Sequence, residues 1–290
     1  MFNTAVLDVG IGLVFTFLAV SLVSSAVTEA LASMLKWRSA TLLTGIKNLL
    51  NDHAFEGLAR SVYNHALINP RADGKAATES EIKSPPTYVD PKQFADALID
   101  VTKIAADAPA GMKAAIDQNV RDPQLNQLLK GIVDRSEGKL DNLQRDLATW
   151  FDSAMDRVGG AYKRKTQLCS FIVALTLAVL LNVDSIHVGK ALWEQPMLAK
   201  AIEVKSGDTP EQTLARLEAL GLPIGWTSET SRRLGQNPME VVVGLLGWLI
   251  TALATLFGAP FWFDSLQRFA RLKGSGPSPS EKKAGTGASA

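Results

Sequence analysis

The chain has 290 residues, and its 30 basic and 29 acidic side chains leave a net charge of +1. This balance provides no general basic field for nucleic acid. The single cysteine, Cys169, excludes an internal disulfide, and its apolar surroundings favour a packing role. The hydrophobic content of 47% is ordinary for a soluble protein, but the apolar residues are concentrated in three stretches.

The three stretches are uncharged and cover residues 9–28, 166–183 and 241–263, or 20, 18 and 23 residues. A helix needs about 20 residues to cross the hydrocarbon core of a bilayer. The sequence therefore predicts three transmembrane helices rather than buried helices of a soluble core, which rarely run so long without a charge. Residues 1–8 contain Asp8 and no Lys or Arg, so the first stretch is interpreted as a retained anchor and not a signal peptide.

Small and hydroxyl side chains mark one face of the first and third stretches. Such faces favour close helix packing, within one chain or between copies, and a pore lining is the alternative. Packing is preferred because no Asp, Glu, His, Lys or Arg lies between the ends of any stretch. The residues are Ser21, Ser24, Ser25 and Thr28 in the first stretch, and Gly244, Gly247, Thr251, Thr255 and Gly258 in the third.

Lys and Arg near the ends of the stretches predict the orientation, because cytoplasmic flanks are enriched in them. The side taken as cytoplasmic carries nine: Lys36, Arg38, Arg157, Lys163, Arg164, Lys165, Arg268, Arg271 and Lys273. The opposite side carries three: Lys190, Arg232 and Arg233. We therefore expect residues 1–8 and 184–240 outside, and residues 29–165 and 264–290 in the cytoplasm.

The cytoplasmic segment, residues 29–165, is expected to form a helical domain with a loop at 70–89, whose charged composition suggests local disorder. Asp90-Pro91 and Asp122-Pro123 are typical helix starts. The last helix carries an apolar stripe that would dock on the other cytoplasmic helices or on a partner: Leu140, Leu143, Leu147, Trp150 and Phe151.

Gly159-Gly160 predicts a bend where this helix reaches the membrane surface. Aromatic and basic residues near the ends of the stretches are expected at the headgroup level, facing anionic lipids. These predicted interface residues are Lys36, Trp37, Arg38, Tyr162, Lys163, Arg164, Lys165, Trp226 and Trp262.

Residues 184–240 are expected to form a small external helical cap, with a strong helix start at Thr209-Pro210. Pro260 predicts a kink near the inner end of the third stretch. The tail, residues 264–290, is predicted to be disordered because it ends in a segment rich in Gly, Ser, Pro and Lys.

Four local motifs carry a resemblance to a known set of proteins. They are Trp150-Phe151-Asp152 with Met155-Asp156-Arg157 and Tyr162-Lys163-Arg164; Asn182-Val183-Asp184; Leu222-Pro223-Ile224-Gly225-Trp226; and Gly258-Ala259-Pro260-Phe261-Trp262-Phe263-Asp264. Together they resemble three-span bacterial inner-membrane proteins that have no established activity. The resemblance implies that location, and it carries no catalytic residues to this chain.

Recognisable catalytic motifs are missing from the sequence. It contains no Gly-rich phosphate loop, no Gly-x-Ser-x-Gly elbow and no lipidation motif. His53, His65 and His187 are scattered over both predicted sides. Asp152 and Asp156 share a helix face, but ion pairing or solvation is a better explanation for them than a metal or acid–base site. We therefore predict no enzyme activity, no cofactor and no metal.

The sequence as a whole predicts an all-α integral membrane protein with three transmembrane helices, a helical cytoplasmic domain and a small external cap. Its expected function is that of a membrane-anchored scaffold or interaction protein whose cytoplasmic domain recruits a protein partner. Membrane lipids are expected partners and nucleic acid is not. The alternatives are a homo-oligomeric channel or membrane-perturbing effector, and an accessory subunit of a larger transport or secretion complex.

Overall fold

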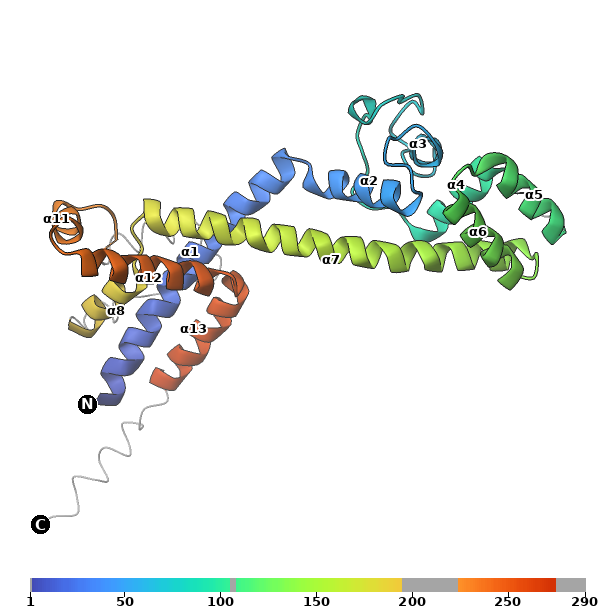
Figure 1. The fold of residues 1–290 in the computed structure, drawn as a ribbon. Helices are drawn as coiled ribbons and strands as arrows, with labels where there is room; N and C mark the ends of the chain where they lie inside the picture. The colour runs from blue at the N-terminus through green and yellow to red at the C-terminus, as the bar shows by residue number, and fades with distance from the viewer. Residues whose placement is uncertain (1, 105–107, 195–223, 275–290) are drawn as a thin grey trace, which may run out of the picture. The chain divides into compact units, whose positions relative to one another are not determined.

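In the computed structural model, every regular element of the described residues, which are 2–104, 108–194 and 224–274, is a helix (Figure 1). The predicted all-α class is therefore confirmed. The elements are α1 (Phe2–Met34), α2 (Trp37–Leu49), α3 (Leu58–Tyr63), the 3-10 turn η1 (Glu79–Glu81), α4 (Pro91–Thr102), α5 (Pro109–Asn119), α6 (Pro123–Arg135), α7 (Leu140–Leu180), α8 (Ser185–Glu194), α11 (Ser228–Gln236), α12 (Pro238–Thr255) and α13 (Gly258–Gly274).

The chain divides into two compact units. One consists of Met1–Leu31 with Thr166–Ala290, and the other of Ala32–Lys165. We call them the apolar unit and the helical unit. Each is described separately below.

The helical unit has a continuous apolar core of its own, formed by α2 to α6 and the N-terminal part of α7. Phe94 of α4 and Phe151 of α7 are fully buried and stack with ring centroids 4.0 Å apart. Gly45 of α2 lies so close to Val158 that a Cβ on the glycine would be 2.8 Å from the valine Cγ2. These contacts fix α2 and α4 against α7.

The two predicted helix starts are confirmed by their capping bonds. Asp90 accepts hydrogen bonds from the backbone N–H groups of Lys92 and Gln93, and Pro91 opens α4. Asp122 accepts one from the Leu125 N–H, and Pro123 opens α6. In both cases the carboxylate satisfies donors that the first helical turn leaves without partners.

The predicted loop at residues 70–89 is present, but the disorder suggested for it is not. Side-chain bonds tie it down at several points: Asn64 to the carbonyl of Ala76, Asn69 to the carbonyl of Lys83, and Lys83 to Asp73. Its charged composition misled the prediction because these local bonds, together with the packing of Ile82 and Val89 on the apolar core, hold the backbone.

The bend predicted at Gly159-Gly160 is wrong, because α7 continues through both glycines as part of one 41-residue helix. Glycine lowers helix stability but does not by itself break a helix whose neighbouring turns are well formed. The two glycines therefore do not mark a bend.

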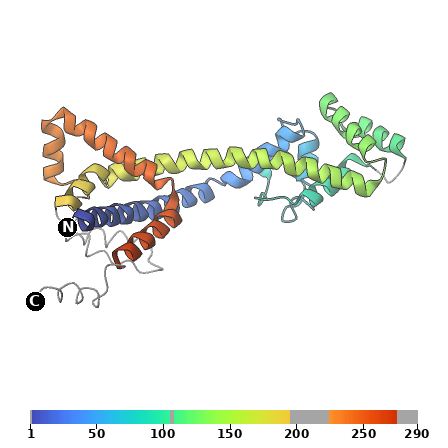
Figure 2. The ribbon, with the colours of Figure 1, turned by 90° about the horizontal axis from the view of Figure 1, so that it is seen from below.

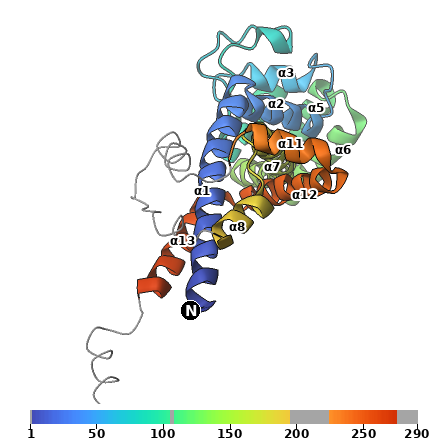
Figure 3. The same ribbon diagram turned by 90° about the vertical axis from the view of Figure 1, so that its left-hand side faces the viewer.

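The apolar unit contains an apolar cluster shared by α1, α8 and α13. Phe17 of α1 lies against Trp262 of α13 with ring centroids 4.8 Å apart, and Phe269 approaches Gly10. These two contacts make α13 antiparallel to the N-terminal half of α1, as Figures 2 and 3 show. The sequence did not predict this return.

Among the described residues, two helices are long and apolar enough to cross a membrane, α1 at Val6–Met34 and α12 at Pro238–Thr255. A third candidate exists if α7 and α8, which meet at an angle of 51°, together form one broken span. The two or three candidate spans support a membrane protein. They do not fully reproduce the predicted set, since the helix of the second stretch ends at Leu180.

The third stretch differs most from its prediction. Its helix ends at Thr255, and Gly258, with φ of +82°, starts α13. The reversal therefore occurs at a glycine that tolerates positive φ, and not as a kink at Pro260. Residues 264–274 of the predicted disordered tail belong to α13. Of the predicted cap, only α8 and α11 fall in the described residues; Thr209-Pro210, the rest of 195–223 and residues 275–290 lie outside them.

Most residues of the small and hydroxyl faces are buried, but Ser25 is exposed and Gly258 is half-buried. Ser21, Ser24 and Thr28 of α1 are at most 5% exposed. Gly244, Gly247, Thr251 and Thr255 form the buried face of α12. The buried members of both faces favour packing within one chain, and the channel alternative stays a prediction.

Candidate functional site

The predicted docking stripe is part of the core of the helical unit. Leu143, Leu147 and Phe151 are each about 1% exposed, while Leu140 and Trp150 pack against the core from its edge. The sequence predicted that the stripe docks either on the other helices of the chain or on a partner. The structure shows the stripe packed on the other helices. The assignment to an external partner is wrong for Leu143, Leu147 and Phe151, because these three side chains are buried in the core, whereas Leu140 and Trp150 stay half-buried.

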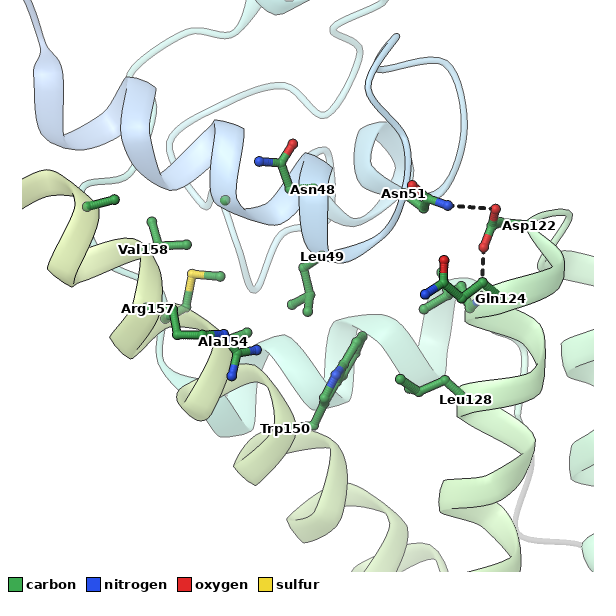
Figure 4. A pocket seen from close by; sticks show the side chains of 14 residues that line it. Asn48, Leu49, Asn51, Asp122, Gln124, Leu128, Trp150, Ala154, Arg157 and Val158 are labelled. Atoms are coloured by element: carbon green, nitrogen blue, oxygen red, sulfur yellow. Dashed lines mark hydrogen bonds between the residues drawn. The ribbon is translucent and has the colours of Figure 1, made fainter.

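A pocket of about 440 Å³ lies beside this core, between α2, α6 and α7 (Figure 4). Figure 4 shows Trp150 of α7 between Leu49 of α2 and Leu128 of α6. The other lining residues are Gly45, Asn48, Asn51, Asp122, Gln124, Leu125, Ala154, Met155, Arg157, Val158 and Ala161. The volume is within the usual range for ligand pockets.

The pocket is lined by apolar side chains and by several polar ones. Its apolar side chains follow α7 from Trp150 to Ala161, a length of about 16 Å at 1.5 Å per residue. The amides of Asn48, Asn51 and Gln124 and the guanidinium of Arg157 supply polar groups. Apolar walls with a few polar groups are the common pattern of sites that receive one face of an amphipathic helix.

A side-chain hydrogen bond crosses one end of this pocket. The Asn51 amide donates to Asp122 Oδ2 at 2.8 Å, while Asp122 Oδ1 caps α6. A second pocket of about 510 Å³ shares Asn51, Asp122 and Leu125 with the first. The sequence identified Asp122 only as a helix cap. Its second role was missed because nothing local in the sequence pairs it with Asn51.

The apolar unit holds a cluster of buried polar side chains where α7 gives way to α8. Asn182, with φ of +47°, donates its amide to the Gly225 carbonyl and accepts from the Trp248 indole at 3.2 Å. The hydroxyl of Thr251 donates to the Val183 carbonyl at 2.7 Å. These bonds satisfy backbone groups that the helix break would otherwise leave without partners in an apolar setting.

Asp184 also lies at the break between α7 and α8, and it is 2% exposed. Its Oδ1 accepts the backbone N–H groups of Ile186 and His187, so it caps α8. A Cβ placed on Gly247 of α12 would lie 1.8 Å from the same oxygen. The buried carboxylate is thus accommodated only because α12 has a glycine at this position. These bonds explain two of the four motifs, around Asn182-Val183-Asp184 and Gly225-Trp226, as structural elements.

The predicted interface residues of the helical unit come together at one place. The Arg38 guanidinium lies 5.9 Å from the ring centroid of Tyr162, and the Lys165 ammonium lies 5.2 Å from that of Trp37. In the apolar unit, the Trp226 indole donates to the Val179 carbonyl and that of Trp262 to the Ala254 carbonyl. These two tryptophans therefore have structural partners, and their place at a membrane interface stays a prediction.

The part of the chain that the structure describes assembles no metal site. No set of three or more His, Cys, Asp or Glu side chains lies within reach of one ion there. His65 lies 3.4 Å from Asp100, His53 is exposed, and Asp152 and Asp156 are exposed on α7. The predictions of no enzyme activity and no cofactor stay predictions.

Comparison with known proteins adds no relative: no protein-family model, curated protein or solved structure matches the chain. The resemblance of the four motifs to bacterial inner-membrane proteins therefore stays a prediction.

Proposed function

We propose that the chain is a membrane-anchored interaction protein whose helical unit binds an amphipathic helix of a protein partner in the pocket between α2, α6 and α7. The observation that carries this proposal is the pocket itself, which is lined by apolar side chains and by several polar ones and is built on a separate helical core. In this proposal the partner docks in the pocket and not on the apolar stripe from Leu140 to Phe151.

The shape of the pocket favours a helix as the occupant. The wall along α7 from Trp150 to Ala161 matches about three turns of a partner helix. Leu128 is 37% exposed at the open side, where an apolar anchor would cover it. The lining amides and Arg157 would then contact the polar flanks of the bound helix.

The apolar unit supplies the anchor in this proposal. The exposed side of α12 is almost entirely apolar: Val241, Val242, Leu245, Leu246, Leu249, Ile250 and Leu253 are all at least 38% exposed. Exposed side chains of this kind suit lipid tails and not water. We therefore place the chain in a membrane, and we propose the bacterial inner membrane on the motif resemblance.

The sidedness of the helical unit follows from the cations that adjoin the first and second apolar stretches. Six of the nine predicted cytoplasmic cations belong to this unit: Lys36, Arg38, Arg157, Lys163, Arg164 and Lys165. Their density favours the cytoplasmic side. The other three predicted cytoplasmic cations, Arg268, Arg271 and Lys273, belong to α13, which returns along α1. The cytoplasmic position of the tail therefore stays a prediction.

Site-specific photo-crosslinking in cells that make the protein tests the proposal. A photoreactive phenylalanine analogue at Leu128 is expected to give a discrete crosslinked protein, whose crosslinked peptide forms an amphipathic helix. The same analogue at Leu67 is the matched control, because Leu67 is 38% exposed in the same unit but lines neither pocket. Equal crosslinking at both positions, or none at Leu128, would overturn the proposal.

A further inference from the structure

Five of the exposed cations of the helical unit lie next to the first and second apolar stretches, and we define them as the basic cluster: Lys36, Arg38, Lys163, Arg164 and Lys165. We propose that this basic cluster, with the bare helix surface at Gly159-Gly160, binds the headgroup of an acidic phospholipid. The inference rests on the membrane anchoring in the proposed function, but not on its partner pocket.

Two reciprocal cation–π contacts join the two segments that carry the cluster, through Arg38 and Lys165. Arg38 at the start of α2 lies over Tyr162 of α7, and Lys165 of α7 lies over Trp37 of α2. Each segment therefore supplies one ring and one cation to the other. The contacts bring cations separated by more than a hundred residues in the sequence to one place and fix their positions.

The sequence segments that carry the cluster supply no carboxylate to balance its charge. Residues 30–51 and 157–183 contain no Asp or Glu. Within the described part of the chain, none of the five side chains takes part in an ion pair. All five are exposed. A concentrated, uncompensated positive charge of this kind attracts a phosphate group.

The two glycines leave room for that group. The position of a Cβ on Gly159 has nothing within 4 Å, and the nearest atom to one on Gly160 is Arg164 Nη1 at 3.8 Å. Gly159 and Gly160 lie one turn before Lys163 and Arg164 on the same helix faces. A headgroup can therefore approach both cations over bare helix, which gives the glycine pair a role without a bend.

The face of α7 that carries Arg164 favours a lipid over free phosphate. Leu168 and Ile172 follow Arg164 at successive four-residue steps, and they are 61% and 54% exposed. A phospholipid with its phosphate at Arg164 would lay an acyl chain along these two residues. Inorganic phosphate makes no use of them.

Lipid titration of the purified full-length protein in mild detergent tests the inference. Dioctanoyl-phosphatidylglycerol is expected to raise the melting temperature and to remain bound in native mass spectrometry. Dioctanoyl-phosphatidylcholine and inorganic phosphate at the same concentrations should do neither. A response to phosphatidylcholine equal to that to phosphatidylglycerol would overturn the inference, and so would an equal response to inorganic phosphate.

Three variants sharpen the test. Arg38→Gln/Lys163→Gln/Arg164→Gln should weaken phosphatidylglycerol binding on the order of a hundredfold, at about fivefold per cation. Gly159→Leu/Gly160→Leu keeps every charge, fills the bare surface and should also lose binding. Arg71→Gln/Lys75→Gln/Lys92→Gln removes the same charge from exposed positions elsewhere and should bind normally.

Retention of binding in both the charge and the glycine variants would contradict the inference. Crosslinking at Leu128 is a separate readout, so a failure of the lipid site is distinguishable from a failure of the partner pocket.

Discussion

Asn51 and Asp122, 71 residues apart in the sequence, are joined by a 2.8 Å hydrogen bond where the two pockets of the helical unit meet. The bond ties Asn51, the second residue after α2, to the start of α6. Because Asp122 also caps α6, one carboxylate serves both the fold of the unit and the shape of the proposed binding pocket.

The bridge between Asn51 and Asp122 predicts a specific pattern of stability loss. Asp122→Ala should destabilise the protein by about 1–2 kcal/mol, since it loses the cap and the bridge. Asn51→Ala should cost about 0.5–1 kcal/mol, and the double variant about as much as Asp122→Ala alone. Thermal unfolding of the wild type, the two single variants and the double variant in detergent measures the coupling energy between Asn51 and Asp122. Strictly additive losses would show that the bond does not contribute.

The continuity of α7 predicts that Gly159→Ala stabilises the protein by roughly 0.5–1 kcal/mol. Alanine favours helix, and nothing lies within 4 Å of its Cβ position. Gly45→Ala is the contrasting variant: its Cβ would lie 2.8 Å from Val158 Cγ2, so we expect a loss of about 1–3 kcal/mol. The melting temperatures of the wild type, Gly159→Ala and Gly45→Ala test both expectations. A lower value for Gly159→Ala would indicate that the helix has to bend there.

Tyr63 is 1% exposed, and its hydroxyl finds no hydrogen-bond partner among the described residues. Tyr63→Phe should therefore stabilise the protein by roughly 1 kcal/mol. Burial raises the pKa of Tyr63 well above its ordinary value of about 10. Only the unfolded chain then ionises this side chain just above pH 10, so stability is retained below that pH and falls as the pH rises beyond it.

Melting curves between pH 8 and pH 11 check this dependence. The wild type should lose more stability above pH 10 than Tyr63→Phe, while the lysines, which both proteins share, lower both curves alike. Parallel curves would contradict the explanation.

The contact of Gly247 with Asp184 predicts coupling between α12 and the start of α8. Gly247→Ala should destabilise the protein by about 1–3 kcal/mol, because its Cβ would displace the capping carboxylate. Asp184→Ala should cost at least about 1 kcal/mol through the lost cap. The double variant should lose less than the sum, since the clash disappears with the carboxylate. If the losses in melting temperature of the two single variants simply add in the double variant, the contact between Asp184 and α12 is contradicted.

Local signals in the sequence predicted much of the fold. Asp90 and Asp122 identified two helix starts correctly because a cap depends on only a few neighbouring residues. The apolar stretches identified the candidate spans, but the end of α12 at Thr255 was missed. An uncharged run continues through Gly258, and only the positive φ of that glycine shows the reversal.

The candidate site was less accessible to prediction. Leu143 and Phe151 were correctly recognised as an apolar face, but periodicity cannot tell whether such a face meets its own chain or another. The pocket depends on Asn51, Leu128 and Trp150, which are far apart in the sequence and show no common motif. Their association follows from tertiary packing, which a single sequence does not reveal.

The most direct test of the partner pocket is co-purification of the protein with its bound partner from cells that make it. We predict that Leu128→Glu abolishes co-purification of the protein that crosslinks at Leu128, since a carboxylate would enter an apolar wall. Leu67→Glu, a change at an equally exposed leucine away from both pockets, should retain it. Retention of the partner by Leu128→Glu at wild-type levels would contradict the proposed function.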